Sequence, residues 1–187
     1  MQVIYKEEFS PHRTHIVEAI IRGDILIYPT DTIYGLGCNA LLPEAVQKIR
    51  EMKKRDPKNP LSVIAPSKEW ILRYCEVGDE RNLDKLPGPF TLILNRKTDC
   101  PIASEVNPYD STLGVRIPSH WFTEIVTEAG VPFVTTSVNF SGGSFMKKIA
   151  DIPEEIVSAT DYCIYEGEKR GVPSTKVNIA GVKTARE

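Results

Sequence analysis

Short apolar segments alternate with amphipathic segments along the whole of this 187-residue chain, and this alternation constrains the fold more than any other feature. Residues 25–28 have the length and composition of a buried strand. Residues 15–22 instead repeat apolar side chains at helical spacing and end at a glycine. Strands interleaved with helices predict an α/β fold, or its α+β variant. The predicted strands cover residues 2–5, 25–28, 61–65, 91–95, 114–117, 133–136, 162–165 and 176–179, and the predicted helices cover residues 15–22, 43–54, 68–74, 120–129 and 153–159.

Length and composition limit the classes of protein to which the chain can belong. A hydrophobic content of 41% with 26% charged residues is typical of a soluble globular domain, and no repeat or change of composition marks a second one. We therefore expect a single domain over residues 1–187. The formal net charge of -2 argues against a protein that coats nucleic acid through bulk positive charge.

Cellular location and metal binding are constrained in the same way. The chain has no apolar run of about 18 residues and no N-terminal signal pattern, so we expect a cytoplasmic protein. Its four cysteines form no C-x-x-C pair, which favours reduced thiols over disulfides or zinc. His12 and His15 could share a helical face and bind a metal, but a third ligand is missing, so a solvated helix start is favoured.

Positive charge is concentrated in residues 48–58, where six basic and two acidic residues give a local charge of +4. In the helix that carries most of this segment, we expect Val46 and Ile49 to face inward and the basic side chains to face solvent. A solvated helix end explains part of the cluster. Because Asn59-Pro60 leads directly into a predicted strand and fixes the cluster at the sheet edge, we favour a phosphate site.

Polar residues also gather where predicted strands end, as they do at the ligand sites of α/β sheets. Threonine, aspartate and glycine occupy residues 29–37, and hydroxyls, an amide and paired glycines follow the strand at 133–136. Such loops bind phosphate oxygens, although tight turns use the same residues. Arg116 lies inside an apolar strand and needs an anionic partner, either an acidic residue of the chain or a carboxylate of a substrate. With no P-loop, dinucleotide fingerprint or nucleophile elbow, the residues indicate a cationic, hydroxyl-rich cleft for a phosphorylated or nucleotide ligand.

Six motifs follow one another between Pro29 and Val177. They are Thr30-Asp31-Thr32-Ile33-Tyr34-Gly35-Leu36, Lys53-x-Arg55 with Asn59-Pro60-Leu61, Leu86-Pro87-Gly88-Pro89-Phe90-Thr91, Gly114-Val115-Arg116-Ile117-Pro118, Ser137-x-Asn139 and Val172-Pro173-Ser174-Thr175. Together they resemble the YrdC/Sua5/TsaC family, whose members are threonylcarbamoyl-AMP synthases. The resemblance implies a YrdC-like twisted, open, mixed β-sheet with flanking helices and a concave basic cleft.

This resemblance also implies a reaction in which L-threonine, bicarbonate or CO2 and ATP yield threonylcarbamoyl-AMP and diphosphate. A separate transferase complex then moves the threonylcarbamoyl group to adenosine 37 of tRNA, which gives the modified nucleoside t6A. In this scheme the carbamate of threonine attacks the α-phosphate, so the protein positions substrates and stabilises charge without a nucleophile of its own. Magnesium is expected to enter with ATP, bound by phosphate oxygens and water and not by a dedicated protein site.

The resemblance further implies roles for individual residues. Those acting at the reacting phosphate would be Lys53, Arg55, Ser137 and Asn139. The implied ATP contacts are Arg55, Asn59, Thr112, Ser137, Asn139, Lys147 and Arg186, and the implied threonine contacts are Thr32, Arg116 and Ser174. Because we expect the basic cluster to be solvated, replacing Lys53 or Arg55 by alanine should abolish most activity and leave the fold intact.

Four positions depart from the family pattern. Ile64 stands where several members have a histidine in the threonine pocket, and Asp56 stands where proline is usual. Thr136 and Val138 replace a common proline and alanine. The chain also resembles the short, single-domain form, which lacks the C-terminal extension of two-domain members.

Two other functions stay open at this point. The first is an RNA-binding module, for tRNA or double-stranded RNA, in which the basic segment contacts backbone phosphates and binding falls steeply with salt. The second is a sugar-phosphate enzyme like dihydroxybutanone phosphate synthase. That chemistry needs acidic metal ligands and a histidine, and the carboxylate-rich loop that would supply them is not evident in the sequence.

Overall fold

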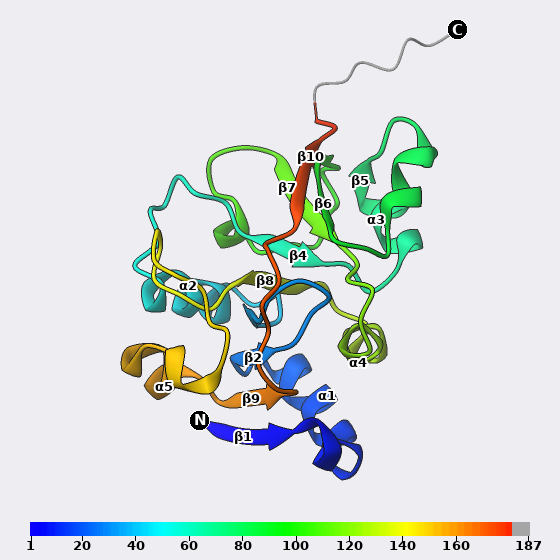
Figure 1. The fold of residues 1–187 in the computed structure, drawn as a ribbon. Helices are drawn as coiled ribbons and strands as arrows, with labels where there is room; N and C mark the ends of the chain where they lie inside the picture. Colours follow the sequence, from blue (N-terminus) through cyan, green and yellow to red (C-terminus); the bar gives the residue numbers. More distant parts are fainter. Residues whose placement is uncertain (181–187) are drawn as a thin grey trace, which may run out of the picture.

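One continuous mixed sheet runs through the computed structural model, which describes residues 1–180 (Figure 1). Its strands in that part of the chain are β1 (Gln2–Tyr5), β2 (Leu26–Tyr28), β3 (Gly35–Gly37), β4 (Ser62–Ile64), β5 (Cys75–Glu76), β6 (Phe90–Arg96), β7 (Thr112–Arg116), β8 (Phe133–Ser137), β9 (Tyr162–Tyr165) and β10 (Thr175–Asn178). The strand order is β1-β9-β2-β3-β8-β4-β7-β6-β10, and β5 pairs with β6. β1 and β10 therefore lie at opposite ends of an open sheet, which confirms the predicted fold class.

Helices cover both faces of this sheet. The described residues form α1 (Arg13–Arg22), α2 (Pro43–Met52), α3 (Lys68–Tyr74), α4 (Phe122–Ala129) and α5 (Glu154–Ala159), with short 3-10 helices η1 (Lys6–Glu8), η2 (Ser10–His12), η3 (Glu80–Lys85), η4 (Ser104–Val106) and η5 (Ile149–Asp151). Ile16 of α1 and Phe122 of α4 share one core cluster with Tyr28, whereas Ile49 of α2 shares another with Ile27. Because adjacent residues of a strand point to opposite faces, the two clusters lie on opposite sides of the sheet. None of the helices in residues 1–180 is long and apolar enough to cross a bilayer.

Each predicted strand and helix is present, with ends displaced by no more than two residues. The prediction missed the two-residue strand β5 and also missed β3. The sequence of β3, Gly35-Leu36-Gly37, resembles a turn because glycine is depleted in strands. A Cβ atom at Gly37 would overlap the carbonyl oxygen of Val134, so glycine permits the close approach of β3 to β8. β3 pairs with β8 in antiparallel register, which places Gly35 opposite Ser137.

The segment from residue 166 to residue 174 connects β9, near one end of the sheet, to β10 at the other, and we name it the crossing segment. It passes over the strands between them (Figure 1). At the start of this segment, the backbone N–H of Glu166 donates to the Tyr34 hydroxyl at 3.0 Å. The same hydroxyl donates to the Gly167 carbonyl at 2.7 Å. A Cβ atom at Gly171 would overlap the carbonyl oxygen of Thr32, so the segment lies directly against the loop after β2.

The Glu166 side chain anchors the crossing segment a second time. Its carboxylate accepts hydrogen bonds from Lys169 at 2.6 Å and from the Trp121 indole at 2.7 Å, and it lies 2.9 Å from the His120 ring. Burial opposes the charged form, but these hydrogen bonds outweigh it and lower the pKa of Glu166 to about 2. Lys169 also donates to the Thr30 carbonyl at 2.9 Å, which ties the segment to the loop that it covers.

Candidate functional site

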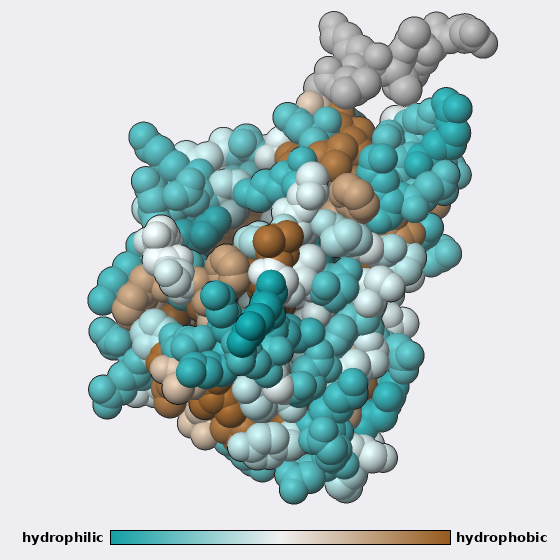
Figure 2. Space-filling model, in the orientation of Figure 1, coloured by the Kyte–Doolittle hydropathy of each residue, from teal (hydrophilic) through white to brown (hydrophobic). Residues whose placement is uncertain are grey.

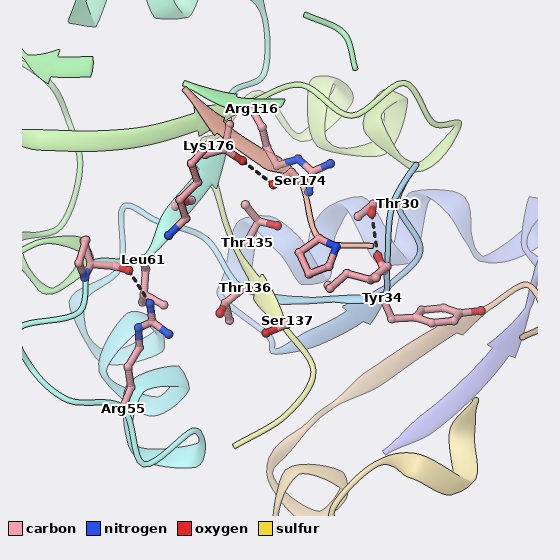
Figure 3. Close-up of a pocket in the computed structure, with 16 residues that line it drawn as sticks. Thr30, Tyr34, Arg55, Leu61, Arg116, Thr135, Thr136, Ser137, Ser174 and Lys176 are labelled. Atoms are coloured by element: carbon pink, nitrogen blue, oxygen red, sulfur yellow. Dashed lines mark hydrogen bonds between the residues drawn. The ribbon is translucent and has the colours of Figure 1, made fainter. Parts of the chain in front are cut away.

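A cavity of about 250 Å³ lies beneath the crossing segment, over the middle strands of the sheet, and we call it the cleft (Figure 3). Its walls come from stretches that are distant in sequence: residues 30–35, residues 55–62, β8 and residues 173–176, together with Thr91 of β6 and Arg116 of β7. The molecular face seen from the side of the crossing segment is largely hydrophilic (Figure 2). The lining residues are Thr30, Ile33, Tyr34, Gly35, Arg55, Pro60, Leu61, Ser62, Thr91, Arg116, Thr135, Thr136, Ser137, Pro173, Ser174 and Lys176.

Positive charge dominates the cleft. Arg55, Arg116 and Lys176 line it from three different parts of the fold, and Figure 3 shows their side chains around one space. Among residues 1–180, no aspartate or glutamate belongs to the lining. Hydroxyl groups of threonine and serine supply the remaining polar surface. This donor-rich, carboxylate-free wall fits an anionic ligand that has several oxygen atoms.

The Arg116 guanidinium is buried at one end of the cleft, with 5% of the residue exposed. Its Nη2 atom lies 2.6 Å from Asp31 Oδ1, and both terminal nitrogens donate to the Thr32 hydroxyl at 3.4 Å. Burial lowers the pKa of Arg116, and the Asp31 charge opposes that shift. The acidic partner left open by the sequence is thus present within the chain. The Nε atom is buried and has no acceptor among the described residues.

The loop Thr30–Thr32 holds this arginine in place through a local hydrogen-bond network. The Thr30 hydroxyl donates to the Ile33 carbonyl at 2.6 Å and accepts from the Thr32 N–H at 3.1 Å. Asp31 Oδ2 accepts from the Ser119 backbone at 2.9 Å. Thr32, a predicted threonine contact, is buried and does not line the cleft. It instead contacts Arg116, which does.

Lys53 is buried beneath the other end of the cleft, with 1% of the residue exposed. Its ammonium donates to the carbonyls of Ser137 and, at 2.7 Å, Asn139, and to Asn139 Oδ1 at 3.0 Å. The Ser137 hydroxyl donates to the same Oδ1 at 2.5 Å. Burial first, and then the Arg55 charge, lower the pKa of Lys53 to about 7. The expectation that Lys53 belongs to a solvated cluster is wrong, because this side chain holds the turn that follows β8.

Arg50 also contradicts the expectation that every basic side chain of α2 faces solvent. It lies four residues after Val46, on the same helical face, and only 6% of it is exposed. Its guanidinium donates to the carbonyls of Glu105 at 2.5 Å and Asn59 at 3.3 Å. Backbone carbonyls, which sequence patterns do not reveal, satisfy this buried charge. Arg50 therefore fixes the loop after α2.

Arg55 is the member of the basic cluster that reaches the cleft. Its Nε atom donates to the Asn59 carbonyl at 3.1 Å and one Nη atom donates to the Pro60 carbonyl at 2.7 Å (Figure 3). These two bonds orient a half-buried guanidinium at the wall. Burial and the neighbouring Arg50 lower the pKa of Arg55, and an anion would relieve that repulsion.

The other predicted residues are not all brought together. Ser137 and Ser174 line the cleft, and the Ser174 hydroxyl lies 2.7 Å from that of Thr91. Asn139 lies behind Ser137, as described above. Asn59, Thr112 and Lys147 do not line the cleft. Arg186 lies outside the described residues.

Several lining residues were not predicted as site residues, above all Lys176 and Thr91. The sequence predicts that Lys176 lies on a strand but does not predict the side on which its amine lies, and Thr91 belongs to a motif for which the resemblance implies no site residue. Among the departures from the family pattern, Thr136 lines the cleft. Ile64 is instead packed in the core beside α1 and α4, away from the lining.

Comparison with known proteins places this geometry among relatives. The family model Sua5_yciO_yrdC, described as "Telomere recombination", matches residues 18–187. A putative threonylcarbamoyl-AMP synthase of Methanocaldococcus jannaschii is 37% identical over 181 residues, which cover 93% of this chain and 83% of that protein. The threonylcarbamoyl-AMP synthase of Bos taurus is 36% identical over 125 residues, which cover 65% of this chain and 45% of that protein. The chain thus spans most of the archaeal relative and about half of the mammalian one.

Solved structures agree with the sequence matches. The P. abyssi Sua5 structure complexed with L-threonine superposes with a TM-score of 0.84 at 28% identity, covering 95% of this chain and 54% of that one. The E. coli YciO structure superposes with a TM-score of 0.83 at 21% identity, covering 97% of this chain and 91% of that one, which supports the fold. The family model, the relatives and the fold agree with the resemblance inferred from six sequence motifs, and the chain belongs to the Sua5/YciO/YrdC family.

Proposed function

We propose that this protein synthesises threonylcarbamoyl-AMP from L-threonine, bicarbonate or CO2 and ATP, and releases diphosphate. The observation that carries the proposal is the cleft itself, where Arg116, Arg55 and Lys176 surround one space without a carboxylate among the described lining residues. Relatives that bear the name threonylcarbamoyl-AMP synthase, and a related Sua5 structure that contains L-threonine, support the assignment.

The two ends of the cleft suit the two substrates. Arg116 can bind the threonine carboxylate, with Thr32 fixing the guanidinium and Ser174 offering a hydroxyl nearby. Arg55 and Ser137, at the end that Lys53 supports from below, suit the phosphates of ATP. A cavity of about 250 Å³ is smaller than a typical pocket for a drug-sized ligand, so it would enclose the reacting groups and leave the adenosine outside.

The chemistry requires charge stabilisation more than a protein nucleophile. The threonine amine bonds to the carbon of bicarbonate or CO2 and gives a carbamate; with bicarbonate a C–O bond breaks and water leaves, and with CO2 the amine loses a proton. A carbamate oxygen then bonds to the α-phosphorus of ATP. The bond from that phosphorus to the bridging oxygen breaks, and diphosphate leaves with the electron pair. Among the described lining residues there is no cysteine or histidine to form a covalent intermediate. Cations that surround the phosphates lower the barrier by neutralising the developing charge.

Magnesium would enter with ATP. In residues 1–180, no group of three or more histidine, cysteine, aspartate or glutamate residues could hold a metal ion, and the described cleft lining has only hydroxyl and carbonyl oxygens. Mg²⁺ prefers carboxylate, phosphate and water oxygens, so phosphate and water are the ligands that fit this donor set. The ion would there offset the negative charge of the triphosphate.

The product would serve tRNA modification. A separate transferase complex would move the threonylcarbamoyl group onto adenosine 37 of tRNA to form t6A. The described cysteines form no disulfide, which fits the reducing cytoplasm that we propose as the location. Direct binding of a long RNA is less well supported, because Arg50 and Lys53, two of the six basic residues in the segment 48–58, are buried.

The proposal is tested by incubating the protein with ATP, bicarbonate and L-threonine and measuring diphosphate release. Release should depend on threonine and fall at least about tenfold in Arg116→Lys, since lysine lacks the bidentate fork. The exposed substitution Arg73→Lys provides a matched control. Release that is independent of threonine would contradict the proposal. Tight RNA binding that falls steeply with salt, in the absence of adenylation, would favour the RNA-binding module instead.

A further inference from the structure

Lys176 lies on β10, the last strand of the sheet. β10 runs parallel to β6, and Lys176 is in register with Thr91. Side chains alternate along a strand, and Val177 packs against the main core, so the Lys176 side chain projects to the opposite face. That face borders the cleft, and Lys176 is one of its lining residues.

The Lys176 amine points across the cleft toward the side on which Arg55 lies (Figure 3). Within residues 1–180, the structure shows no salt bridge or hydrogen bond of this amine. Arg55 faces the same space from the loop after α2. Two like charges that share a cavity repel each other, and an anion between them converts that repulsion into two attractions. The arrangement is therefore suited to a ligand with at least two negative charges.

A lysine on an edge strand also has an ordinary explanation, because such charges prevent strands of neighbouring molecules from pairing. A guarding lysine would serve equally well anywhere along the solvent side of the edge. Lys176 instead lies over a cavity that contains two arginines and Ser137 and, among the described lining residues, no carboxylate. This position is what a ligand-binding role requires.

We propose that Lys176 and Arg55 hold the polyphosphate of the nucleotide between them, so that β10 supplies a phosphate-binding residue from the wall opposite the basic cluster. The proposal rests on the proposed function, which supplies the triphosphate as the anion. The phosphates would then be bound from two opposite walls of the cleft, whereas the basic segment alone would bind them from one wall.

The test compares Lys176→Met, which keeps the length of the side chain without its charge, with Lys176→Arg. Binding of inorganic pyrophosphate is measured by isothermal titration calorimetry. Lys176→Met should weaken binding about tenfold, as expected for the loss of a charge-assisted hydrogen bond, and Lys176→Arg should restore most of it. Lys58→Met is the matched control, because Lys58 is exposed on the loop that carries Arg55 and does not line the cleft. It should change the pyrophosphate affinity less than about twofold.

Steady-state kinetics separate this proposal from the proposed function. If the function holds, Lys176→Met should raise the KM for ATP and leave the KM for threonine unchanged. A wild-type protein that binds pyrophosphate through Lys176 but shows no threonine-dependent turnover would preserve the phosphate site and refute the proposed function. Unchanged pyrophosphate affinity in Lys176→Met, a wild-type protein that binds no pyrophosphate, or a change confined to the KM for threonine would overturn the assignment. Self-association of Lys176→Met with normal pyrophosphate affinity would instead identify an edge-guarding lysine.

Discussion

Replacement of Lys53 by methionine tests whether this lysine stabilises the fold from within. Methionine preserves most of the buried alkyl volume and removes the ammonium. Of its three acceptors, the Asn139 carbonyl would then lose its donor among the described residues, whereas Asn139 Oδ1 keeps the Ser137 hydroxyl and the Ser137 carbonyl keeps the Asn139 N–H. An unsatisfied buried acceptor costs about 1 to 3 kcal/mol, so the variant should lose about 2 kcal/mol of unfolding free energy. The turn that carries Ser137 should loosen as a result.

Urea denaturation followed by circular dichroism measures this loss directly. With a slope of about 2 kcal/mol per molar urea, a loss of about 2 kcal/mol lowers the midpoint by about 1 M. Lys54→Met is the matched control, because the neighbouring Lys54 is exposed and its amine makes two surface contacts, a 3.8 Å ion pair with Glu155 and a cation–π contact 4.3 Å from the centre of the Phe140 ring. That variant should stay within about 0.5 kcal/mol of wild type. Equal midpoints for the Lys53 and Lys54 variants would refute the structural role of Lys53.

The pH dependence of stability gives an independent readout for the same residue. The pKa of Lys53 falls from 10.5 to about 7 on folding, so between these values the unfolded chain binds more protons than the folded one. The unfolding free energy contributed by this group therefore rises with pH in that window, by at most about 1.4 kcal/mol per pH unit. Lys53→Met should lack this rise when its stability is measured at pH 7, 8 and 9 beside wild type. If the unfolding free energies of the two proteins differed by the same amount at all three pH values, the lowered pKa of Lys53 would be contradicted.

Three other substitutions test contacts around the cleft. Asp31→Asn removes the charge that faces Arg116 and should lower the unfolding free energy by about 3 kcal/mol, measured in urea; an unchanged midpoint would show that the ion pair is dispensable. The pKa of Glu166 is about 2 in the folded protein against 4.5 for an unperturbed glutamate, so wild type should lose stability as the pH falls from 4.5 to 2. Glu166→Gln should lose less over that range in acid-denaturation curves, and parallel curves would contradict the assignment. Gly171→Ala would force a Cβ against the Thr32 carbonyl and should lower threonine-dependent turnover by about tenfold or more without loss of secondary structure, whereas wild-type turnover would show that the crossing segment can shift freely.

The elements that sequence could predict are those with a hydrophobic pattern. α3 and β9 occur at their predicted bounds because apolar residues at helical or strand spacing face a core. β3 has no such pattern, because its place depends on a close approach to β8 that only glycine permits. The site nevertheless depends on β3, because pairing of β3 with β8 brings the loop after β2 beside Ser137. Tertiary approach of this kind is invisible to local propensity.

The site was predictable in part for a similar reason. Ser137, Ser174, Arg55 and Arg116 lie at strand ends or in motifs, and the structure brings them to one cleft. The burial of Lys53 depends on carbonyl groups of the turn after β8, and backbone acceptors leave no trace in residue types. Sequence therefore identified the right cluster and assigned the wrong environment to its central lysine.

The basic segment combines two physical roles that a mutational study must separate. The Lys53 ammonium donates to the backbone carbonyls of Ser137 and Asn139 and so stabilises the turn that carries Ser137. A Lys53 variant can therefore lose activity because this turn is displaced, just as it can because a phosphate contact is lost. Arg55 is half-buried and lines the cleft, and its carbonyl partners Asn59 and Pro60 lie on its own loop. Only a substitution that lowers phosphate affinity while the urea midpoint stays near wild type reports on ligand binding. The contacts of Arg55 predict that its substitution meets this condition, and the contacts of Lys53 predict that its substitution does not. The two basic residues of the Lys53-x-Arg55 motif therefore act by different mechanisms.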